Sequence, residues 1–220
     1  MSHRYTAAST SLRTAAIMML FTVAFTAVMS ATYDATRPVI EASAQEGKMR
    51  LINEVLPPGS YDNTLLDDFV AIGPTPQLGL DEGGRIYRAR RDGAPAALVL
   101  EAVAPDGYAG RIQLVVAVSA DGRVSGVRVV GHKETPGLGD YIDPRKDRNK
   151  AQPWIEQFGG VSLADVAAAK WTVKRDGGAF AYRIGATISA RAVSRATGRV
   201  LEYATGNRDA LFAAQAGSGI

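Results

Sequence analysis

The sequence predicts an α+β protein in which a single N-terminal transmembrane helix and a stalk precede an antiparallel-rich sheet with packed helices. Three observations predict this: an uncharged apolar run near the N-terminus, a series of short β-rich runs separated by turn residues, and an amphipathic helical pattern near the C-terminus. We expect three parts: residues 1–33 as cytoplasmic N-terminus and transmembrane helix, 34–58 as a helical stalk, and 59–220 as one extracytoplasmic domain.

The apolar run from Thr14 to Tyr33 holds 20 residues without a charge. At a rise of ~1.5 Å per residue, a helix of this length spans roughly the 30 Å hydrocarbon core of a bilayer. Arg4 and Arg13 precede the run and Asp34 follows it, which by the positive-inside tendency places the N-terminus in the cytoplasm. A cleaved signal peptide is the alternative, but the run is longer than a usual signal core and no clean small-x-small site follows it.

Helix-compatible sequence continues beyond the apolar run and stops at Pro57-Pro58-Gly59. The continuing apolar positions are Val39, Ile40, Met49, Leu51, Ile52 and Val55. We therefore expect a stalk that holds the following domain close to the bilayer.

The sheet is predicted from β-rich runs after this stop, with Asp121-Gly122 as a hairpin signal between the last two runs. This order of runs predicts an antiparallel meander. After a polar loop at 131–149, we expect two short helices and then a return to strand. The expected strands are Arg85 to Arg90, Ala96 to Val103, Arg111 to Ser119, Arg123 to Val130 and Trp171 to Arg175, and the short helices are Trp154 to Phe158 and Leu163 to Lys170.

The last predicted element is an amphipathic helix from about Ser189 to Thr205, because apolar residues recur there at i, i+3 and i+4 spacing. We expect its apolar side to pack on the sheet. The residues on that side are Val193, Ala196, Val200, Leu201 and Ala204.

Composition excludes several classes of site. The net charge is only +3, and the basic residues are interspersed with acidic ones instead of forming a basic face. We therefore expect no nucleic-acid partner. There are no cysteines, which excludes disulfides, iron–sulfur ligation and thiolate zinc sites. With only His3 and His132 as histidines, we expect no protein metal site and no histidine-ligated haem. A redox cofactor of this protein must therefore be organic.

Familiar catalytic motifs are also missing from the sequence. There is no Walker loop and no Gly-x-Ser-x-Gly elbow, and Gly137-x-Gly139 lacks the third glycine of a dinucleotide fingerprint. A hydrolytic triad would have to use His132, which we interpret instead as a solvated or hydrogen-bonded loop residue. We expect no catalytic residue in the chain.

The segment Gly185-Ala186-Thr187-Ile188-Ser189 lies at the entrance to the last helix. Helix N-termini present N–H groups without intrahelical partners and a partial positive charge, so a phosphate attached to a side chain here would meet donors already in place. Gly185 and Ala186 leave the approach uncrowded. On these grounds alone, the simpler interpretation is that Thr187 or Ser189 is a helix N-cap.

A second candidate segment is the loop His132-Lys133-Glu134-Thr135-Pro136-Gly137-Leu138-Gly139-Asp140, which follows a predicted strand. Pro136 and the two glycines let the backbone turn tightly and approach a flat ligand closely, and Leu138 could lie against the face of such a ligand. Taken alone, the loop is more typical of an ordinary surface loop that closes a strand.

The membrane helix, these two segments and three further stretches follow one another in a fixed order that covers nearly the whole chain. The stretches concerned are Ile52-Asn53-Glu54-Val55-Leu56-Pro57, Tyr61-Asp62-Asn63, Glu134 to Asp140, Trp171 to Gly178 and Gly185 to Ser189. In this combination the chain resembles the covalent FMN-binding domain family, which is shared by the Rnf and Na+-translocating NADH:quinone reductase complexes, and it is most similar to the G subunits of Rnf complexes.

This resemblance implies that Thr187 is linked to the phosphate of FMN in a phosphodiester, which a separate flavin transferase makes from FAD. Two positions depart from the family pattern: Ala181 stands where many members carry an aspartate, and Ser189 stands where threonine is frequent. The other cofactor-binding residues that the resemblance implies are Gly185, Ala186, Ser189, Glu134, Thr135, Leu138 and Gly139.

The function implied by the resemblance is that of an electron-carrying subunit in a membrane-bound, ion-translocating ferredoxin:NAD oxidoreductase complex. The implied partners are the polytopic, iron–sulfur and flavin subunits of that complex, the flavin transferase during maturation, and the lipid bilayer. The implied location is the bacterial inner membrane, with a single pass and the C-terminal domain on the periplasmic side.

Two hypotheses from other classes remain open at this point. One is a membrane-tethered flavin-domain sensor or assembly factor without an electron-transfer role, although such proteins usually bring further membrane helices or cysteine-rich modules. The other is a cofactor-free binding module anchored at the membrane surface.

Overall fold

The computed structural model describes residues 7–219, without the side chains of residues 7–9, 41, 44 and 45. His3 and Arg4 therefore lie outside the described residues. The chain divides into two compact units, Met1–Gly47 and Lys48–Ile220. Helix α1 (Ala7–Val55) contributes to both units, and it ends just before the proline pair, as predicted.

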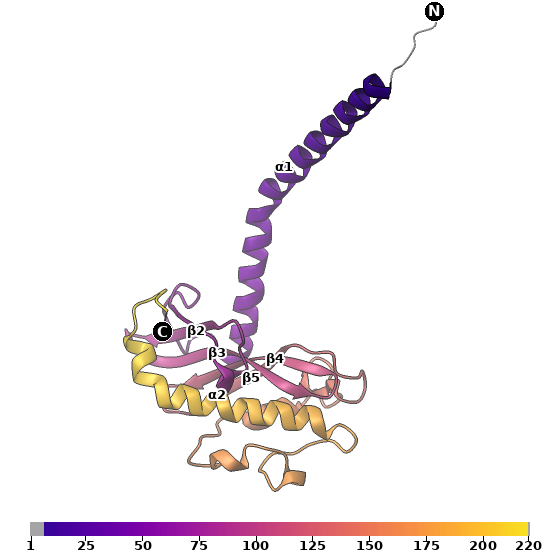
Figure 1. Ribbon diagram of the computed structural model, residues 1–220. Coiled ribbons are helices and arrows are strands. Elements are labelled where there is room, and N and C mark those ends of the chain that lie inside the picture. Colours follow the sequence, from indigo (N-terminus) through magenta and orange to yellow (C-terminus); the bar gives the residue numbers. More distant parts are fainter. Residues whose placement is uncertain (1–6, 220) are drawn as a thin grey trace, which may run out of the picture. The chain divides into compact units, whose positions relative to one another are not determined.

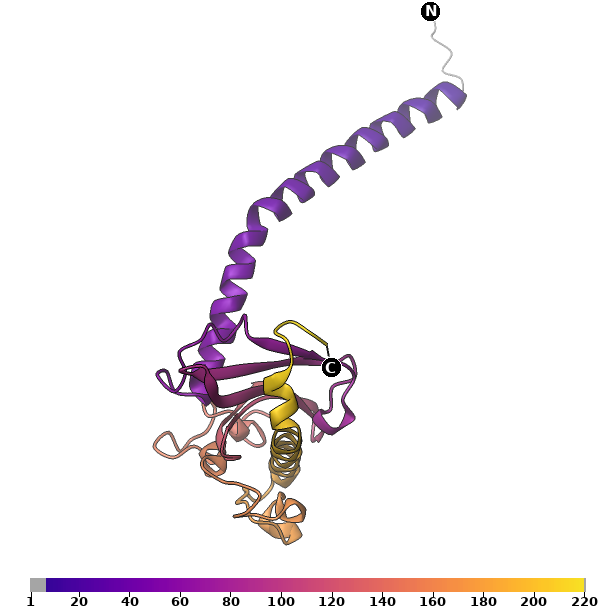
Figure 2. The ribbon, with the colours of Figure 1, turned by 90° about the vertical axis from the view of Figure 1, so that its left-hand side faces the viewer.

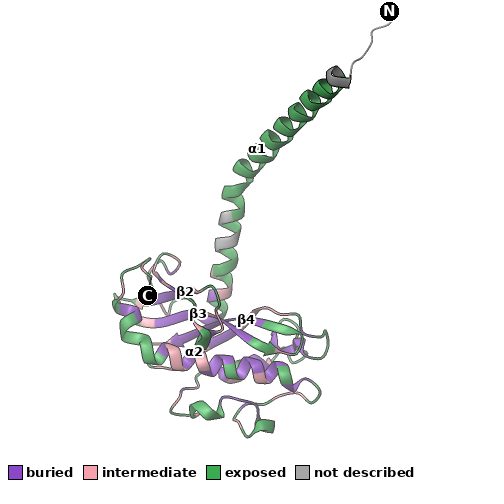
Figure 3. Cartoon of the chain, viewed as in Figure 1, coloured by how far each residue is buried: buried purple, intermediate pink, exposed green. Residues whose placement is uncertain are grey.

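The first unit consists of α1 up to Gly47. Its segment Thr10–Ile40 is long and apolar enough to cross a membrane. A signal sequence near the N-terminus can have the same length and apolar character. The large apolar side chains of this segment are exposed (Figure 3). The hydroxyls of Thr22 and Thr32 each donate to the carbonyl oxygen four residues back, at 2.8 Å, so these polar groups are satisfied without water, as lipid requires.

The second unit is built on an antiparallel sheet whose spatial order is β1-β2-β3-β4-β5, so the predicted meander is confirmed. One strand, β1, was not predicted, because it is short and borders a turn-rich stretch. It pairs with β2 and also with the C-terminal segment, where the N–H of Ala71 donates to the carbonyl of Ser218 at 2.9 Å. The strands are β1 (Phe69–Ile72), β2 (Gly84–Arg91), β3 (Ala94–Gly107), β4 (Gly110–Ser119) and β5 (Val124–Gly131).

Both faces of the sheet are buried within the second unit. Along β3, Leu98 and Leu100 point to one face while Ala97 and Val99 point to the other. Helix α2 (Thr187–Ala213) lies across the first face, as Figures 1 and 2 show. The last turns of α1 and the segment after it cover part of the second face. Each fully buried Val or Leu side chain stabilises the fold by roughly 1.5–3 kcal/mol.

Helix α2 is longer at both ends than the predicted span from Ser189 to Thr205. Its buried positions stop at Ala204 and resume at Leu211 and Phe212, so the exposed residues between them interrupt the apolar periodicity. Its C-terminal carbonyls, which have no intrahelical partners, accept hydrogen bonds from two arginines of β2. Arg88 donates to Leu211 and Ala214, and Arg90 donates to Phe212.

The segment between β5 and α2 is mostly irregular and is held by packed aromatic rings, with neighbouring ring centres 4.7 to 6.3 Å apart. The predicted helix at Trp154–Phe158 is confirmed as the 3-10 helix η3. The other short helices here are η2 (Asp140–Ile142), η4 (Ala168–Lys170) and η5 (Lys174–Asp176). The packed rings are Tyr141, Trp154, Phe158, Trp171 and Phe180.

Two predictions for this segment are wrong. The span Leu163–Lys170 is not a helix, since only its last three residues form η4. The span Trp171–Arg175 is not a strand, because the chain folds back on itself at η5, where Gly177 adopts a left-handed backbone. Only an isolated bridge joins Val173 to Phe180. The apolar residues that suggested a strand are instead used for packing under α2.

Candidate functional site

A tight turn delivers the chain into α2. The N–H of Ala186 donates to the carbonyl of Arg183 at 3.1 Å, which closes a four-residue turn. Gly185 is the third residue of this turn and has a φ of 89°, a conformation that glycine adopts without steric cost. The residue before it, Ile184, is 93% exposed. The sequence Gly-Ala-Thr is therefore a turn followed directly by the first helical residue.

The interpretation of Thr187 or Ser189 as the N-cap is wrong. The N-cap is Ala186, which makes no side-chain cap hydrogen bond, so Thr187 is the first residue inside the helix. Thr187 is 7% exposed. The hydroxyl of Ser189 is used elsewhere, as a donor to Glu134. The first-turn N–H groups of α2 accordingly have neither an intrahelical acceptor nor a cap from these two side chains.

The loop at 132–140 folds into a compact turn beside the start of α2. The carbonyl of Thr135 accepts hydrogen bonds from the N–H groups of Leu138 and Gly139, at 3.1 and 3.0 Å. His132 accepts the N–H of Glu134 through Nδ1 at 3.1 Å, which agrees with its interpretation as a hydrogen-bonded loop residue. The loop is thus closed by its own backbone before it meets the helix.

Glu134 joins this loop to α2 and to the β3–β4 hairpin. Its side chain is 4% exposed. One carboxylate oxygen accepts the Ser189 hydroxyl at 2.5 Å, and the other accepts the backbone N–H of Ala109 at 3.1 Å. A buried carboxylate is costly unless such donors surround it, so these bonds fix three chain segments against one another.

Gly139 permits the close contact between loop and helix. A Cβ atom at this position would lie 2.7 Å from the Ser189 hydroxyl and 2.9 Å from a carboxylate oxygen of Glu134. Neither atom belongs to the free end of a flexible surface chain. A glycine is therefore required here by packing, and not by an unusual backbone angle.

These segments enclose a hollow of about 140 Å³, which we call the α2 hollow. All eight residues predicted to bind a cofactor line it, although their role in binding stays a prediction. Sequence reasoning missed Tyr108 and Ile188; the only available signal for Tyr108 was an aromatic residue within a hairpin turn. The lining residues are Tyr108, Glu134, Thr135, Leu138, Gly139, Gly185, Ala186, Thr187, Ile188 and Ser189.

Large apolar side chains on and beside the α2 hollow are exposed. Tyr108, Leu138 and Ile188 line the hollow and remain exposed, and Ile184 projects from the adjoining turn. Exposed apolar groups gathered around a concave site are typical of a binding surface. The arrangement combines a hydroxyl at a helix N-terminus with an apolar rim, which suits a ligand that has a phosphate at one end and a flat ring at the other.

Position 181, where the sequence departs from the family pattern, is held by two side chains of η3. The carbonyl of Ala181 accepts the indole N–H of Trp154 at 2.7 Å, and its N–H donates to the Gln157 side chain at 2.8 Å. Ala181 itself is exposed. The backbone at this position is therefore fixed by neighbours and not by its own side chain.

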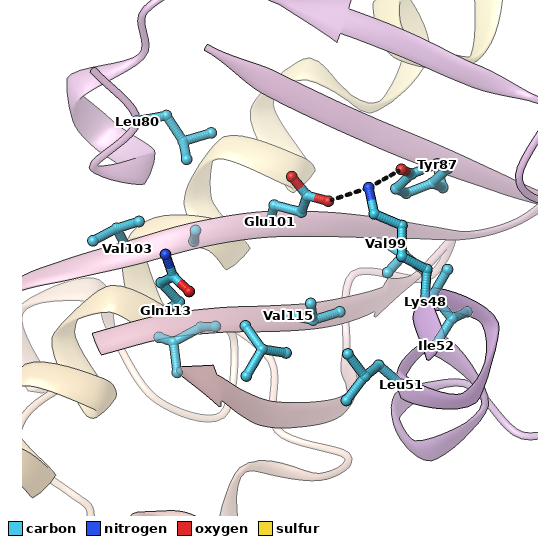
Figure 4. A pocket seen from close by; sticks show the side chains of 13 residues that line it. Lys48, Leu51, Ile52, Leu80, Tyr87, Val99, Glu101, Val103, Gln113 and Val115 are labelled. Atoms are coloured by element: carbon cyan, nitrogen blue, oxygen red, sulfur yellow. Dashed lines mark hydrogen bonds and ion pairs between the residues drawn. The ribbon is translucent and has the colours of Figure 1, made fainter. Parts of the chain in front are cut away.

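A larger hollow of about 300 Å³ lies on the other face of the sheet, and we call it the sheet-face hollow (Figure 4). Its walls are the last turns of α1 and mostly apolar residues of β3 and β4. Its cation, Lys48, bonds to the Tyr87 hydroxyl at 3.3 Å and to Glu101 at 3.4 Å. No serine or threonine is among the described residues that line it.

Comparison with known proteins identifies both parts of the chain. A family model described as FMN-binding domain matches residues 107–202, and one described as RnfG N-terminal region matches residues 1–55. Every residue that lines the α2 hollow falls inside the first match.

Several relatives, each named as the G subunit of an ion-translocating oxidoreductase complex, match almost the full length of the chain. The protein of Pseudomonas aeruginosa is 45% identical over 94% of this chain and 95% of its own. The proteins of Pseudoalteromonas atlantica and Shewanella loihica are 43% and 38% identical, over 90% and 91% of this chain and 90% and 92% of their own.

These names agree with an electron-carrying subunit, and nothing in them favours a sensor or an assembly factor. The match to an FMN-binding domain likewise argues against a module without a cofactor. The shared sequence over nearly the whole length shows that this chain belongs to the family of G subunits of ion-translocating oxidoreductase complexes.

Proposed function

We propose that this chain carries FMN covalently on Thr187 and relays electrons through it within an ion-translocating ferredoxin:NAD oxidoreductase complex. The observation that carries the proposal is the position of Thr187, as the first residue of α2 and on the wall of the α2 hollow. A phosphate on this residue would meet the first-turn N–H groups and the positive end of a long helix.

The residues around Thr187 fit FMN. The α2 hollow is smaller than the roughly 300–1,000 Å³ of usual ligand pockets, so it would enclose only part of the molecule. The exposed side chains of Tyr108, Leu138 and Ile188 offer apolar surface for a flat ring beside it. FMN bound here would supply one- or two-electron transfer, while the chain positions the ring and controls its exposure to water.

The covalent link would form in a reaction that needs FAD and the flavin transferase. The Thr187 hydroxyl would attack the phosphorus of the FMN half of FAD. A new oxygen–phosphorus bond would form, the pyrophosphate bond would break, AMP would leave, and the hydroxyl proton would pass to a base of the transferase or to water. The chain itself therefore needs only a hydroxyl in the right backbone setting.

Mass spectrometry of the native-host protein tests this assignment. Cleavage after Arg183 and Arg191 releases residues 184–191, and we expect this peptide to carry the added mass of FMN. Because the peptide contains both Thr187 and Ser189, fragmentation must place the mass on Thr187. We also expect flavin fluorescence to travel with the polypeptide in denaturing electrophoresis.

The variant Thr187→Val should lose that fluorescence, whereas the control Thr205→Val, at an exposed position of the same helix, should keep it. Persistent fluorescence in the first variant would show that the flavin is attached elsewhere.

We further propose that residues 1–33 form the cytoplasmic N-terminus and a retained transmembrane helix, 34–58 the stalk, and 59–220 the periplasmic FMN-binding domain in the inner membrane. The apolar, exposed span of α1 supports an anchor of this kind. The natural chain has no cysteine, so single cysteines introduced at the exposed positions Leu12 and Asp209 can report the two sides. In intact spheroplasts, an impermeant maleimide should label Asp209→Cys and spare Leu12→Cys; the reverse result would invert the topology.

A further inference from the structure

An ion pair holds the turn that precedes Thr187. The guanidinium of Arg183, in this turn, pairs with the carboxylate of Asp147, in the loop after η2. Asp147 is 0% exposed, and it also accepts the backbone N–H groups of Asn149 at 2.9 Å and Trp154 at 2.8 Å. These bonds fix the carboxylate independently of α2, so Asp147 is a stationary anchor for Arg183.

The Tyr141 hydroxyl holds the same turn at both ends. It accepts the backbone N–H of Arg183 at 3.1 Å and donates to the carbonyl of Ala186 at 3.3 Å. The ring of Tyr141 is buried and lies under the Arg183 guanidinium, 4.6 Å from ring centre to Cζ. The hydroxyl therefore sets the distance between the first and last residues of the turn, and the ion pair ties the first residue to Asp147.

These contacts are of a kind that fixes geometry. A buried carboxylate that loses its cation is left uncompensated, so the pair strongly favours one arrangement of the turn. The turn leads into Thr187 with no intervening residue, and Ala186 is both the last turn residue and the N-cap of α2. Any displacement of the turn is therefore passed on to Thr187.

We infer that Asp147, Arg183 and Tyr141 are positioning residues for the covalent attachment of flavin, which act by holding the turn Arg183–Ala186 so that Thr187 faces the α2 hollow. This inference rests on the proposed function, because it assumes that Thr187 is the attachment site. None of the three side chains lines the α2 hollow, so they act through the turn and not by contact with the flavin.

The test measures the rate of flavin attachment in the full-length chain, produced in its native host with its transferase. Intact-mass spectrometry at successive times after induction gives the fraction that carries FMN, which avoids the cleavage site lost in Arg183→Gln. A shift of about 1 Å in a reacting group can cost as much as ~100-fold in rate. We expect Arg183→Gln and Asp147→Asn to slow attachment at least about tenfold, and Tyr141→Phe to slow it several-fold.

A second ion pair in the same loop supplies the matched control. Arg145 pairs with the buried Asp143 at 2.9 Å, but neither side chain contacts the turn before Thr187. Arg145→Gln removes the same charge as Arg183→Gln, and we expect wild-type attachment rates from it. Arg183→Lys keeps the charge, and we expect it to restore much of the rate lost in Arg183→Gln.

The outcomes separate the inference from the proposed function. Absence of the FMN mass from the wild-type chain would reject the proposed function. A loaded wild-type chain, with wild-type rates in Arg183→Gln and Tyr141→Phe, would reject the inference alone. Equal slowing in Arg145→Gln and Arg183→Gln would also reject it, since the effect would then follow any lost ion pair. The attachment rate of Asp147→Asn bears on the inference if this variant keeps the wild-type melting temperature. If it does not, Tyr141→Phe, which removes only one oxygen atom, decides the question.

Discussion

The two hollows lie on opposite faces of one sheet, and they differ in what their walls are made of. The sheet-face hollow is the larger, at about 300 Å³ against about 140 Å³, and apolar side chains dominate its walls. Its charged groups, Lys48 and Glu101, are paired with each other and partly exposed. The α2 hollow is bounded by the buried carboxylate of Glu134, the buried hydroxyl of Ser189 and a glycine that no other residue can replace without a clash.

This difference shows that size alone does not mark a functional site. Buried polar groups are retained in a fold only where other groups satisfy them, and they then hold their surroundings in one arrangement. The α2 hollow has such groups in its wall, next to a hydroxyl at a helix N-terminus. We therefore expect changes at the α2 hollow to affect both stability and flavin content, and changes at the sheet-face hollow to affect neither strongly.

The largest expected effect is that of Gly139→Ala. The new methyl group would press on Ser189 and Glu134, and overpacking of this kind costs about 2–3 kcal/mol. Denaturant unfolding should show the loss, and intact mass should show less FMN per chain. The control Gly73→Ala meets nothing within 4 Å and should leave both measurements unchanged. Wild-type stability and loading in Gly139→Ala would show that the loop can move away from the helix freely.

A smaller loss is expected from Ser189→Ala. The variant removes the hydroxyl that donates to Glu134 and leaves one buried carboxylate oxygen without that donor, which costs about 1–2 kcal/mol. The free energy of unfolding measures the loss directly. Ser189→Thr keeps the hydroxyl and should recover most of it. If both variants were equally destabilised, packing and not the hydrogen bond would account for the effect.

Acid should weaken the region next to the α2 hollow. Burial by itself would raise the pKa of Asp147, but the N–H groups of Trp154 and Asn149 and the guanidinium of Arg183 lower it below its ordinary value of 3.8. The folded state therefore binds the proton less well than the unfolded state does. The stabilisation is complete above the ordinary pKa and is lost as pH falls through the lower folded value. Melting temperatures measured from pH 5 downward should fall less steeply for Asp147→Asn than for wild type.

The smallest effect is expected from Lys48→Met, on the wall of the sheet-face hollow. The ion pair with Glu101 is exposed, so its loss should cost under about 1 kcal/mol, and flavin content should not change. Burial opposes the charge on Lys48, but the Tyr87 hydroxyl and Glu101 raise its pKa above the ordinary 10.5. That stabilisation is present below 10.5 and is lost as pH rises through the folded value, so only the alkaline end of the stability profile should flatten. A loss of flavin in this variant would connect the two hollows.

Much of the fold was predictable because local patterns determine it. Strands β2 to β5 alternate in side-chain direction and are separated by turn residues, and α2 has a buried face with helical spacing. Strand β1 was missed because it is short and borders a turn-rich stretch, and because one of its two partners, residues 217–219, is distant in sequence. Long-range pairing leaves no local signal. The apolar run at Trp171 was mistaken for a strand because periodicity cannot distinguish a strand from a short packed loop.

The residues of the candidate site were predictable, but the hydrogen bonds and ion pairs among them were not. The two glycine-containing loops drew attention to this region, and the family resemblance then named eight residues that line the α2 hollow. The contact between Glu134 and Ser189, which are 55 residues apart, depends on the folded chain and could not be read from either loop. The same applies to the pairing of Arg183 with Asp147, since the segment around Asp147 carries several charges of both signs and the sequence does not reveal which of them Arg183 meets.

The buried Arg88, which contacts the C-terminal end of α2, links the folding of the sheet to the synthesis of the last part of the chain. Arg88 is 2% exposed, pairs with Asp68, and donates to carbonyls of Leu211 and Ala214. Strand β1 also needs residues 217 and 218 as backbone partners. These contacts of Arg88 and β1 therefore form only after residues 211–218 have been synthesised. A chain cut short before these residues would bury a guanidinium without two of its acceptors, and we expect cellular proteases to remove it before it could accept a cofactor.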